Sequence, residues 1–171
     1  LSALAGSLGF ALETTPPVMM DGERISSTRI RQSIRDGRLD VAAKMLGRPY
    51  TIAGRVVEGR KLGRQLGFPT ANVEPGEEQF PPDGVWAVRV RVGEQFLGGV
   101  ANLGVRPTVD GASRSLEVHL FDFTGDLYGR VIEVEFLQFL RGEKKFGSLD
   151  ELKEAIRADA DAAAGILREA E

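Results

Sequence analysis

Apolar and polar residues alternate in several segments of the chain after residue 50, which is the pattern of half-buried β-strands. The stretch 84–104, GVWAVRVRVGEQFLGGVANLG, contains two such runs separated by GEQ and predicts a β-hairpin. Further strands are predicted over 50–59, 113–123 and 129–140.

The alternation also predicts which side chains share a face, because successive residues of a strand point to opposite sides of the sheet. The shared faces are Trp86, Val88, Val90 and Val92 opposite Arg89 and Arg91; Leu116, Val118 and Leu120 opposite Ser115, Glu117 and His119; and Ile132, Val134 and Phe136.

Two short helices are predicted before the strands. The stretch 25–37, ISSTRIRQSIRDG, has its N-cap candidates in the Ser-Ser-Thr run and ends at Asp-Gly. The stretch 39–47, LDVAAKMLG, predicts a second helix capped by Asp40 and ended by Gly47. Residues 1–24 show no clean periodicity.

One longer helix is predicted over 148–167, after the last strand. Ser148 and Glu151 form a capping-box pattern at its start. Its apolar stripe consists of Leu149, Leu152, Ile156, Ala160 and Ala163. Several short strands followed by one helix favour an antiparallel barrel closed by a helix.

Composition narrows the classes of function. With 42% hydrophobic and 27% charged residues over 171 positions, the chain is typical of a soluble globular protein. A net charge of -3 gives no reason to expect a nucleic-acid partner. Cysteine is absent and His119 is the single histidine, which excludes thiolate sites and any site that needs two histidines. Since no apolar run approaches the roughly 20 residues of a membrane span, we expect no membrane partner and a cytoplasmic location.

The stretch 59–75, GRKLGRQLGFPTANVEP, combines glycines, prolines and two polar side chains. It is either an ordinary long turn or a loop that wraps phosphates, because glycines let backbone N–H groups approach anionic oxygens and Lys61 and Arg64 supply positive charge. Thr70 and Asn72 would face the same side of an extended segment and offer oxygens to Mg²⁺. The order of residues does not match the G-x-x-x-x-G-K-[ST] phosphate loop.

Glu117 is the candidate general base. It is either a solvent-facing carboxylate or, inside a barrel mouth, a group that accepts a hydroxyl proton during phosphoryl transfer. A single histidine in this position is more often packed or hydrogen-bonded than a ligand.

Four segments in this order resemble the riboflavin kinase module of bacterial bifunctional riboflavin kinase/FAD synthetases: GRKLGRQLGFPTANV, GGVANLGVRPT, SLEVHLFDFTGDLYG and FLRGEKKFGSLDEL. The match covers about residues 48–168. It implies a mainly β fold, a six-stranded antiparallel Greek-key barrel closed by a C-terminal helix. It also implies transfer of the ATP γ-phosphate to the riboflavin 5′-hydroxyl, giving FMN and ADP.

The resemblance implies roles for individual residues. Glu117 corresponds to the base, and Thr70 and Asn72 to the ligands of Mg²⁺ and the phosphates. The flap over ATP corresponds to Gly59, Lys61, Gly63, Arg64 and Pro69. Arg141 and Phe146 correspond to the flavin-binding loop. The roles of Asn102, Arg106 and Thr108 stay open.

Residues 1–47 resemble the end of the α/β nucleotidyltransferase module that precedes the kinase domain, 48–171, in these proteins. ISSTRIR (25–31) is similar to its phosphate-contacting signature, whereas its H-x-G-H signature is absent. The chain also begins with Leu1, so we expect a piece of a longer protein. We predict that this fragment lacks FAD synthetase activity, which the full-length protein would have, together with possible self-association.

Two alternatives remain on the sequence alone. A flavin-binding barrel without catalysis would explain the strands but gives no purpose to Thr70 and Asn72. An oligonucleotide-binding barrel is disfavoured by the net charge and by the few aromatic residues. The expected partners are therefore small-molecule substrates.

Overall fold

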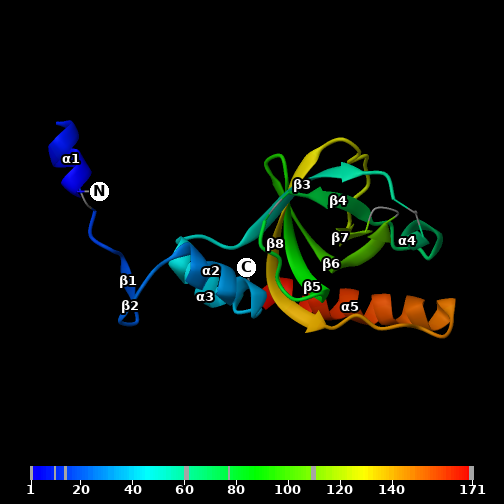
Figure 1. Ribbon diagram of the computed structural model, residues 1–171. Helices are drawn as coiled ribbons and strands as arrows, with labels where there is room; N and C mark the ends of the chain where they lie inside the picture. The colour runs from blue at the N-terminus through cyan, green and yellow to red at the C-terminus, as the bar shows by residue number, and fades with distance from the viewer. Residues whose placement is uncertain are drawn as a thin grey trace.

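Six antiparallel strands form a closed barrel in a computed structural model that describes residues 2–9, 11–13, 15–59, 62–76, 78–108 and 111–169 (Figure 1). The order around the barrel is β3-β4-β7-β6-β5-β8, and β8 pairs with β3 to close it. The strands are β3 Thr51–Val57, β4 Ala71–Pro75, β5 Gly84–Val92, β6 Gln95–Thr108, β7 Gly111–Leu120 and β8 Val131–Arg141.

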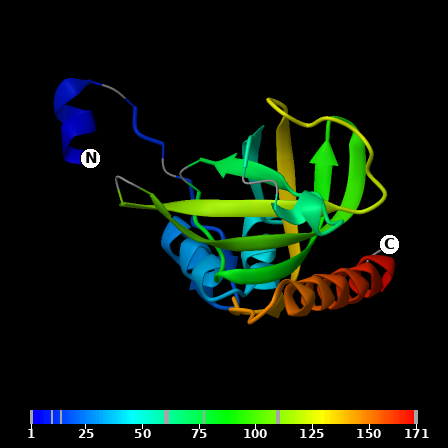
Figure 2. The same cartoon turned by 90° about the vertical axis from the view of Figure 1, so that its right-hand side faces the viewer.

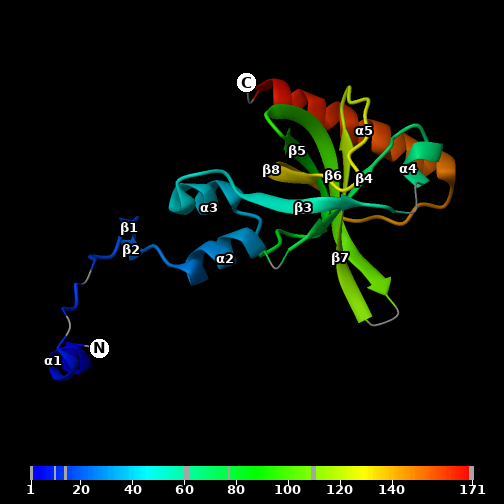
Figure 3. The ribbon, with the colours of Figure 1, turned by 90° about the horizontal axis from the view of Figure 1, so that it is seen from above.

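The connection order is that of a Greek key. Strands β5, β6 and β7 follow one another as neighbours, and β8 returns to lie beside β5. The predicted Greek-key barrel with a C-terminal helix is therefore confirmed. The paired ends of β6 and β7 project away from the body of the barrel (Figure 3).

The barrel interior is filled by the faces that the alternation predicted. Trp86, Val88 and Val90 are at most 2% exposed and pack with the inward residues of β7 and β8. Among the described residues, these apolar side chains make much of the interior a packed core.

Helix α5, Leu149–Glu169, lies against the outer face of β5 and β6 (Figure 2). Val85, Ala87 and Val100 point outward from these strands and pack with Ala163 of the helix. Leu149, which was predicted on the apolar stripe, is 60% exposed, because the first turn of α5 starts beyond the area that packs on the barrel.

The start of α5 follows the capping-box prediction in part. The Glu151 N–H donates to Ser148 Oγ at 3.2 Å. The Glu151 carboxylate accepts from the N–H of Gly147 at 2.9 Å, one residue earlier than in the predicted pattern.

The N-terminal region contains α1 Ser2–Leu8, β1 Met19–Met20, β2 Glu23–Arg24, α2 Ser27–Arg35 and α3 Leu39–Leu46. Ser26 caps α2, since its Oγ accepts from the Arg29 N–H at 3.3 Å. The predicted cap of α3 was wrong. The first bond of that helix runs from the Ala42 N–H to the carbonyl of Arg38, so Arg38 is the N-cap and Asp40 lies within the first turn.

Helices α2 and α3 cover one end of the barrel. Ile34, Leu39 and Ala42 belong to the same buried cluster as the barrel interior. Gly37, in the turn between the helices, lies against Pro82 and Trp86. Packing therefore continues across residue 47, and the domain boundary proposed there stays a prediction. Among the described helices, none has the length and apolar character to cross a bilayer.

Candidate active site

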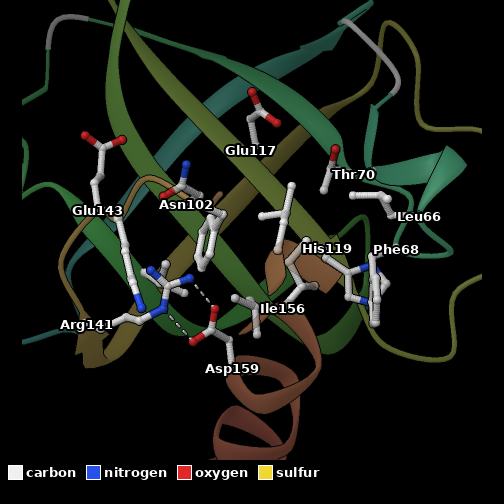
Figure 4. Close-up of a pocket in the computed structure, with 16 residues that line it drawn as sticks. Leu66, Phe68, Thr70, Asn102, Glu117, His119, Arg141, Glu143, Ile156 and Asp159 are labelled. Carbon is white, nitrogen blue, oxygen red and sulfur yellow. Dashed lines mark hydrogen bonds and ion pairs between the residues drawn. The ribbon is translucent and has the colours of Figure 1, made fainter. Parts of the chain in front are cut away.

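A cavity of about 320 Å³ lies between the outer face of the barrel and the side of α5 (Figure 4). Strands β5, β6 and β7 supply one wall together with Thr70, which lies just before β4. The end of β8, the loop after it and α5 supply the other wall, and the glycine-rich loop borders one end. The lining residues are Gly63, Leu66, Phe68, Thr70, Val85, Val100, Asn102, Glu117, His119, Arg141, Glu143, Lys144, Phe146, Leu152, Ile156 and Asp159.

Glu117 stands in a row of polar residues across three strands. It pairs with Asn72 of β4 on one side and with Asn102 of β6 on the other. Its neighbours Leu116 and Val118 point into the barrel core, so Glu117 points outward. The expectation of a carboxylate inside a barrel mouth was therefore wrong in its location, because apolar side chains fill the interior. The outward face of β7 nevertheless brings Glu117 and Thr70 to one cavity.

The glycine-rich loop folds back on the two polar residues that follow it. It contains a short helix, α4 Leu62–Gln65, that the sequence pattern did not predict. A β-carbon at Gly59 would overlap the carboxamide of Asn72, and one at Gly63 would overlap the Phe68 carbonyl and lie 3.3 Å from Thr70 Oγ1. These two glycines let the backbone approach Asn72 and Thr70 more closely than other residues would.

Thr70 also borders a second, smaller cavity of about 100 Å³. Arg64 and Pro69 line this cavity together with residues of the loop between β7 and β8, among them Phe123 and Tyr128. Asn72 lines a third cavity and not the first two, although its strand position places it beside Glu117. Thr70 is therefore the residue at which the first two cavities meet.

At the other end of the large cavity, Arg141 binds Asp159 of α5 (Figure 4). Its Nε and Nη2 donate to the two carboxylate oxygens at 2.9 and 2.8 Å, and Nη1 donates to the Gly142 carbonyl at 3.1 Å. Its guanidinium carbon lies 5.6 Å from the ring centre of Phe146. All three guanidinium nitrogens are engaged by the protein, which leaves the flat face of Arg141 for contacts with a ligand.

Three of the residues named in the sequence analysis lie wholly or partly outside the described part of the chain. Lys61 falls outside the described residues, as do the side chains of Arg106 and Thr108. The sequence pattern missed Asp159, which is 8% exposed and reads as one more polar position of an amphipathic helix. It also missed Glu143 as a lining residue and left the role of Asn102 open, since their contribution depends on how α5 and the loop pack.

Comparison with known proteins gives one family. The family model described as riboflavin kinase matches residues 46–167. A bifunctional riboflavin kinase/FMN adenylyltransferase from Haemophilus influenzae is 47% identical over 165 residues, which are 95% of this chain and 53% of that protein. The chain thus spans about half the length of the curated relatives it matches.

Two solved structures share the fold. A protein from Streptococcus pneumoniae described as a macrolide-efflux protein is 38% identical with a TM-score of 0.77, over 92% of this chain and 52% of that one. The riboflavin kinase of Trypanosoma brucei is 23% identical with a TM-score of 0.51, over 70% of this chain and 80% of that one.

Proposed function

This chain belongs to the riboflavin kinase family, and from that premise we propose that it transfers the γ-phosphate of ATP to the 5′-hydroxyl of riboflavin, giving FMN and ADP. One observation carries the proposal for this chain: two cavities meet at Thr70, and Glu117 lines the larger of them. A reaction between two substrates needs two adjoining sites with a proton acceptor near their junction.

The larger cavity suits the flavin. Much of its lining is apolar, from Val85 and Val100 of the barrel to Leu152 and Ile156 of α5, and a volume near 320 Å³ falls in the range of small-molecule sites. Phe146 supplies an aromatic edge or face. Because Asp159 holds the guanidinium fork of Arg141, we assign Arg141 a stacking role with the ring system.

The smaller cavity and the glycine-rich loop suit ATP. Arg64 supplies positive charge beside Thr70, and backbone at Gly59 and Gly63 comes close to Asn72 and Thr70. We assign Gly59, Lys61, Gly63, Arg64 and Pro69 to the nucleotide side. With the nucleotide there, the phosphates extend toward Thr70 and the ribityl chain approaches from the larger cavity.

Glu117 acts as the general base in this scheme. The riboflavin 5′-oxygen forms a bond to the γ-phosphorus while the bond from that phosphorus to the β,γ-bridging oxygen breaks. The hydroxyl proton passes to the carboxylate of Glu117, and ADP leaves with the bridging oxygen. The reaction requires no covalent intermediate on Glu117, since positioning and charge neutralisation dominate phosphoryl transfer.

The residues present fit Mg²⁺. Among the described residues, no cluster of three or more acidic or histidine side chains is placed to hold a metal alone. Thr70 and Asn72 instead offer neutral oxygens, and Mg²⁺ commonly takes one or two protein ligands together with water and substrate phosphates. When bound, Mg²⁺ would neutralise charge on the phosphates. Gly59 leaves space that a β-carbon would fill beside the Asn72 carboxamide.

The test is incubation of the purified chain with riboflavin, ATP and Mg²⁺, followed by chromatographic detection of FMN. FMN formation that requires all three components is expected. Flavin binding without FMN formation would contradict the proposal and support a carrier.

We further propose that the full-length protein adenylylates FMN, and that this chain alone does not. Conversion of FMN and ATP to FAD by the purified chain would contradict the last statement.

A further inference from the structure

His119 is a polar residue of the cavity that the proposed mechanism does not use. It lies two residues after Glu117 on β7, and it is the single histidine of the chain. Its Nδ1 lies 2.9 Å from the carbonyl oxygen of Pro69. A carbonyl oxygen only accepts hydrogen bonds, so Nδ1 carries a proton and donates.

Two aromatic rings set the orientation of this imidazole. Phe68 contacts it edge-on with ring centres 5.5 Å apart, and Phe121 does so at 5.9 Å. Edge-on aromatic contacts restrict rotation of the ring. The imidazole is thus held with Nδ1 toward Pro69.

The hydrogen bond lies where the pairing of β4 with β7 stops. The last backbone pair joins Ala71 to Val118. Pro69 has no N–H, so the ladder cannot continue through it. The His119 side chain makes a cross-strand link at this point and fixes the peptide group that joins Pro69 to Thr70.

We propose that His119 is a positioning residue for phosphoryl transfer. It ties the peptide before Thr70 to the strand that carries Glu117, and so sets the Thr70 hydroxyl relative to the carboxylate. His119 does not exchange a proton with substrate in this proposal. The proposal rests on the riboflavin kinase activity proposed above.

Two substitutions separate the hydrogen bond from the packing. His119→Phe keeps a ring between Phe68 and Phe121 but removes the donor. His119→Asn loses the ring but keeps an N–H donor, because Nδ2 of asparagine is bonded to Cγ as Nδ1 of histidine is. We expect His119→Phe to lower kcat/KM for Mg-ATP on the order of tenfold while KM for riboflavin stays within about twofold. His119→Asn should recover most of the loss.

A lower kcat/KM for Mg-ATP in His119→Asn than in His119→Phe would overturn the proposal and indicate that His119 acts through packing. Wild-type kinetics in His119→Phe would overturn it as well. Thermal unfolding midpoints of both variants, measured alongside, check that each assay reports folded protein.

A second measurement needs no turnover. The ¹⁵N NMR spectrum of the single histidine in the wild-type chain reports which ring nitrogen carries the proton when the imidazole is neutral. We expect the Nδ1–H tautomer. The Nε2–H tautomer would overturn the hydrogen bond, and with it this inference, without bearing on the kinase reaction. Absence of FMN formation by the wild-type chain would overturn the proposed function instead and leave the tautomer result standing.

Discussion

The two walls of the large cavity are built in different ways. The strand wall carries Thr70, just before β4, and Glu117 of β7, whose partner in the strand ladder is Asn72 of β4. Backbone hydrogen bonds between these strands set the spacing of the three residues. The helix wall carries Arg141, Phe146 and Asp159 on the end of β8, the following loop and α5, where a side-chain ion pair joins the elements.

This difference suggests that the two walls have different functions. A strand ladder holds side chains at fixed intervals, which suits groups that must meet reacting atoms. An ion pair between the last residue of a strand and a helix can adjust to the shape of a bound ring. Substitutions on the strand wall should therefore change the rate of phosphoryl transfer or the binding of Mg-ATP, and those on the helix wall should change riboflavin binding.

The largest effect is expected from Glu117→Gln on the strand wall. The amide keeps the size of the side chain but cannot accept the hydroxyl proton, so kcat should fall by about 100-fold or more while ATP still binds. Steady-state kinetics of FMN formation and an ATP-binding isotherm measure the two quantities. Glu133→Gln, at an exposed ion pair with Arg91 elsewhere on the barrel, is the matched control and should leave kcat unchanged. Full turnover in Glu117→Gln would remove Glu117 from the base role.

Asn72→Ala should produce the next largest effect. Loss of the carboxamide oxygen should weaken Mg-ATP binding by about tenfold and riboflavin binding much less. Titration with Mg²⁺ at fixed ATP should show a higher Mg²⁺ requirement. Equal losses for both substrates would mean that Asn72 only holds the shape of the glycine-rich loop, since its carboxamide packs against Gly59.

Arg141→Lys tests the helix wall. Lysine keeps the charge but loses the two-point bond to Asp159 and the flat face over Phe146, so KM for riboflavin should rise by about fivefold. The value of kcat should change less than KM. Arg91→Lys, at the ion pair with Glu133, serves as the control. A fall in kcat with unchanged KM would contradict the division between the walls.

Tyr50, at the barrel end covered by α2 and α3, should affect stability and not catalysis. Its hydroxyl donates to the Gln79 carbonyl, and burial, with a smaller contribution from the charge of Glu78, raises the pKa of Tyr50 from 10.0 to about 12. The folded chain therefore holds the phenol proton more tightly than the unfolded chain. This contribution to stability is complete below pH 10 and is lost as the pH rises toward 12.

Tyr50→Phe should lower the free energy of unfolding by about 1 kcal/mol and flatten that part of the pH dependence. Denaturant unfolding at several pH values, compared with the wild type, measures both effects. Kinetic constants should match the wild type. A change in kcat or in KM for riboflavin in Tyr50→Phe would show that the geometry of the site depends on the stability of the whole barrel and not only on the residues that line the cavity.

Much of the strand wall followed from sequence. Alternation assigned Leu116 and Val118 to one face of β7 and Glu117 to the other, and the structure has them so. Alternation does not say which elements cover an outer face, because that depends on where α5 packs. Glu117 was accordingly expected at a barrel mouth, whereas it lies on the outward face of β7, in the strand wall of the cavity.

The helix wall was harder to predict from the sequence. Asp159 is a buried acidic residue of α5 that binds Arg141, a contact between positions 18 residues apart that no local pattern encodes. Helix α4 is four residues long inside a glycine-rich loop, too short to show a helical period. Leu149 fits the apolar stripe by spacing, but its turn lies beyond the packed area.

The most direct test of the proposed site is a crystal structure of this chain with ADP, Mg²⁺ and FMN. The flavin ring is expected in the large cavity against Arg141 and Phe146, ADP in the smaller one, and the FMN phosphate between Thr70 and Glu117. An FMN phosphate far from the carboxylate of Glu117, or a flavin bound outside the cavity beside α5, would contradict the account.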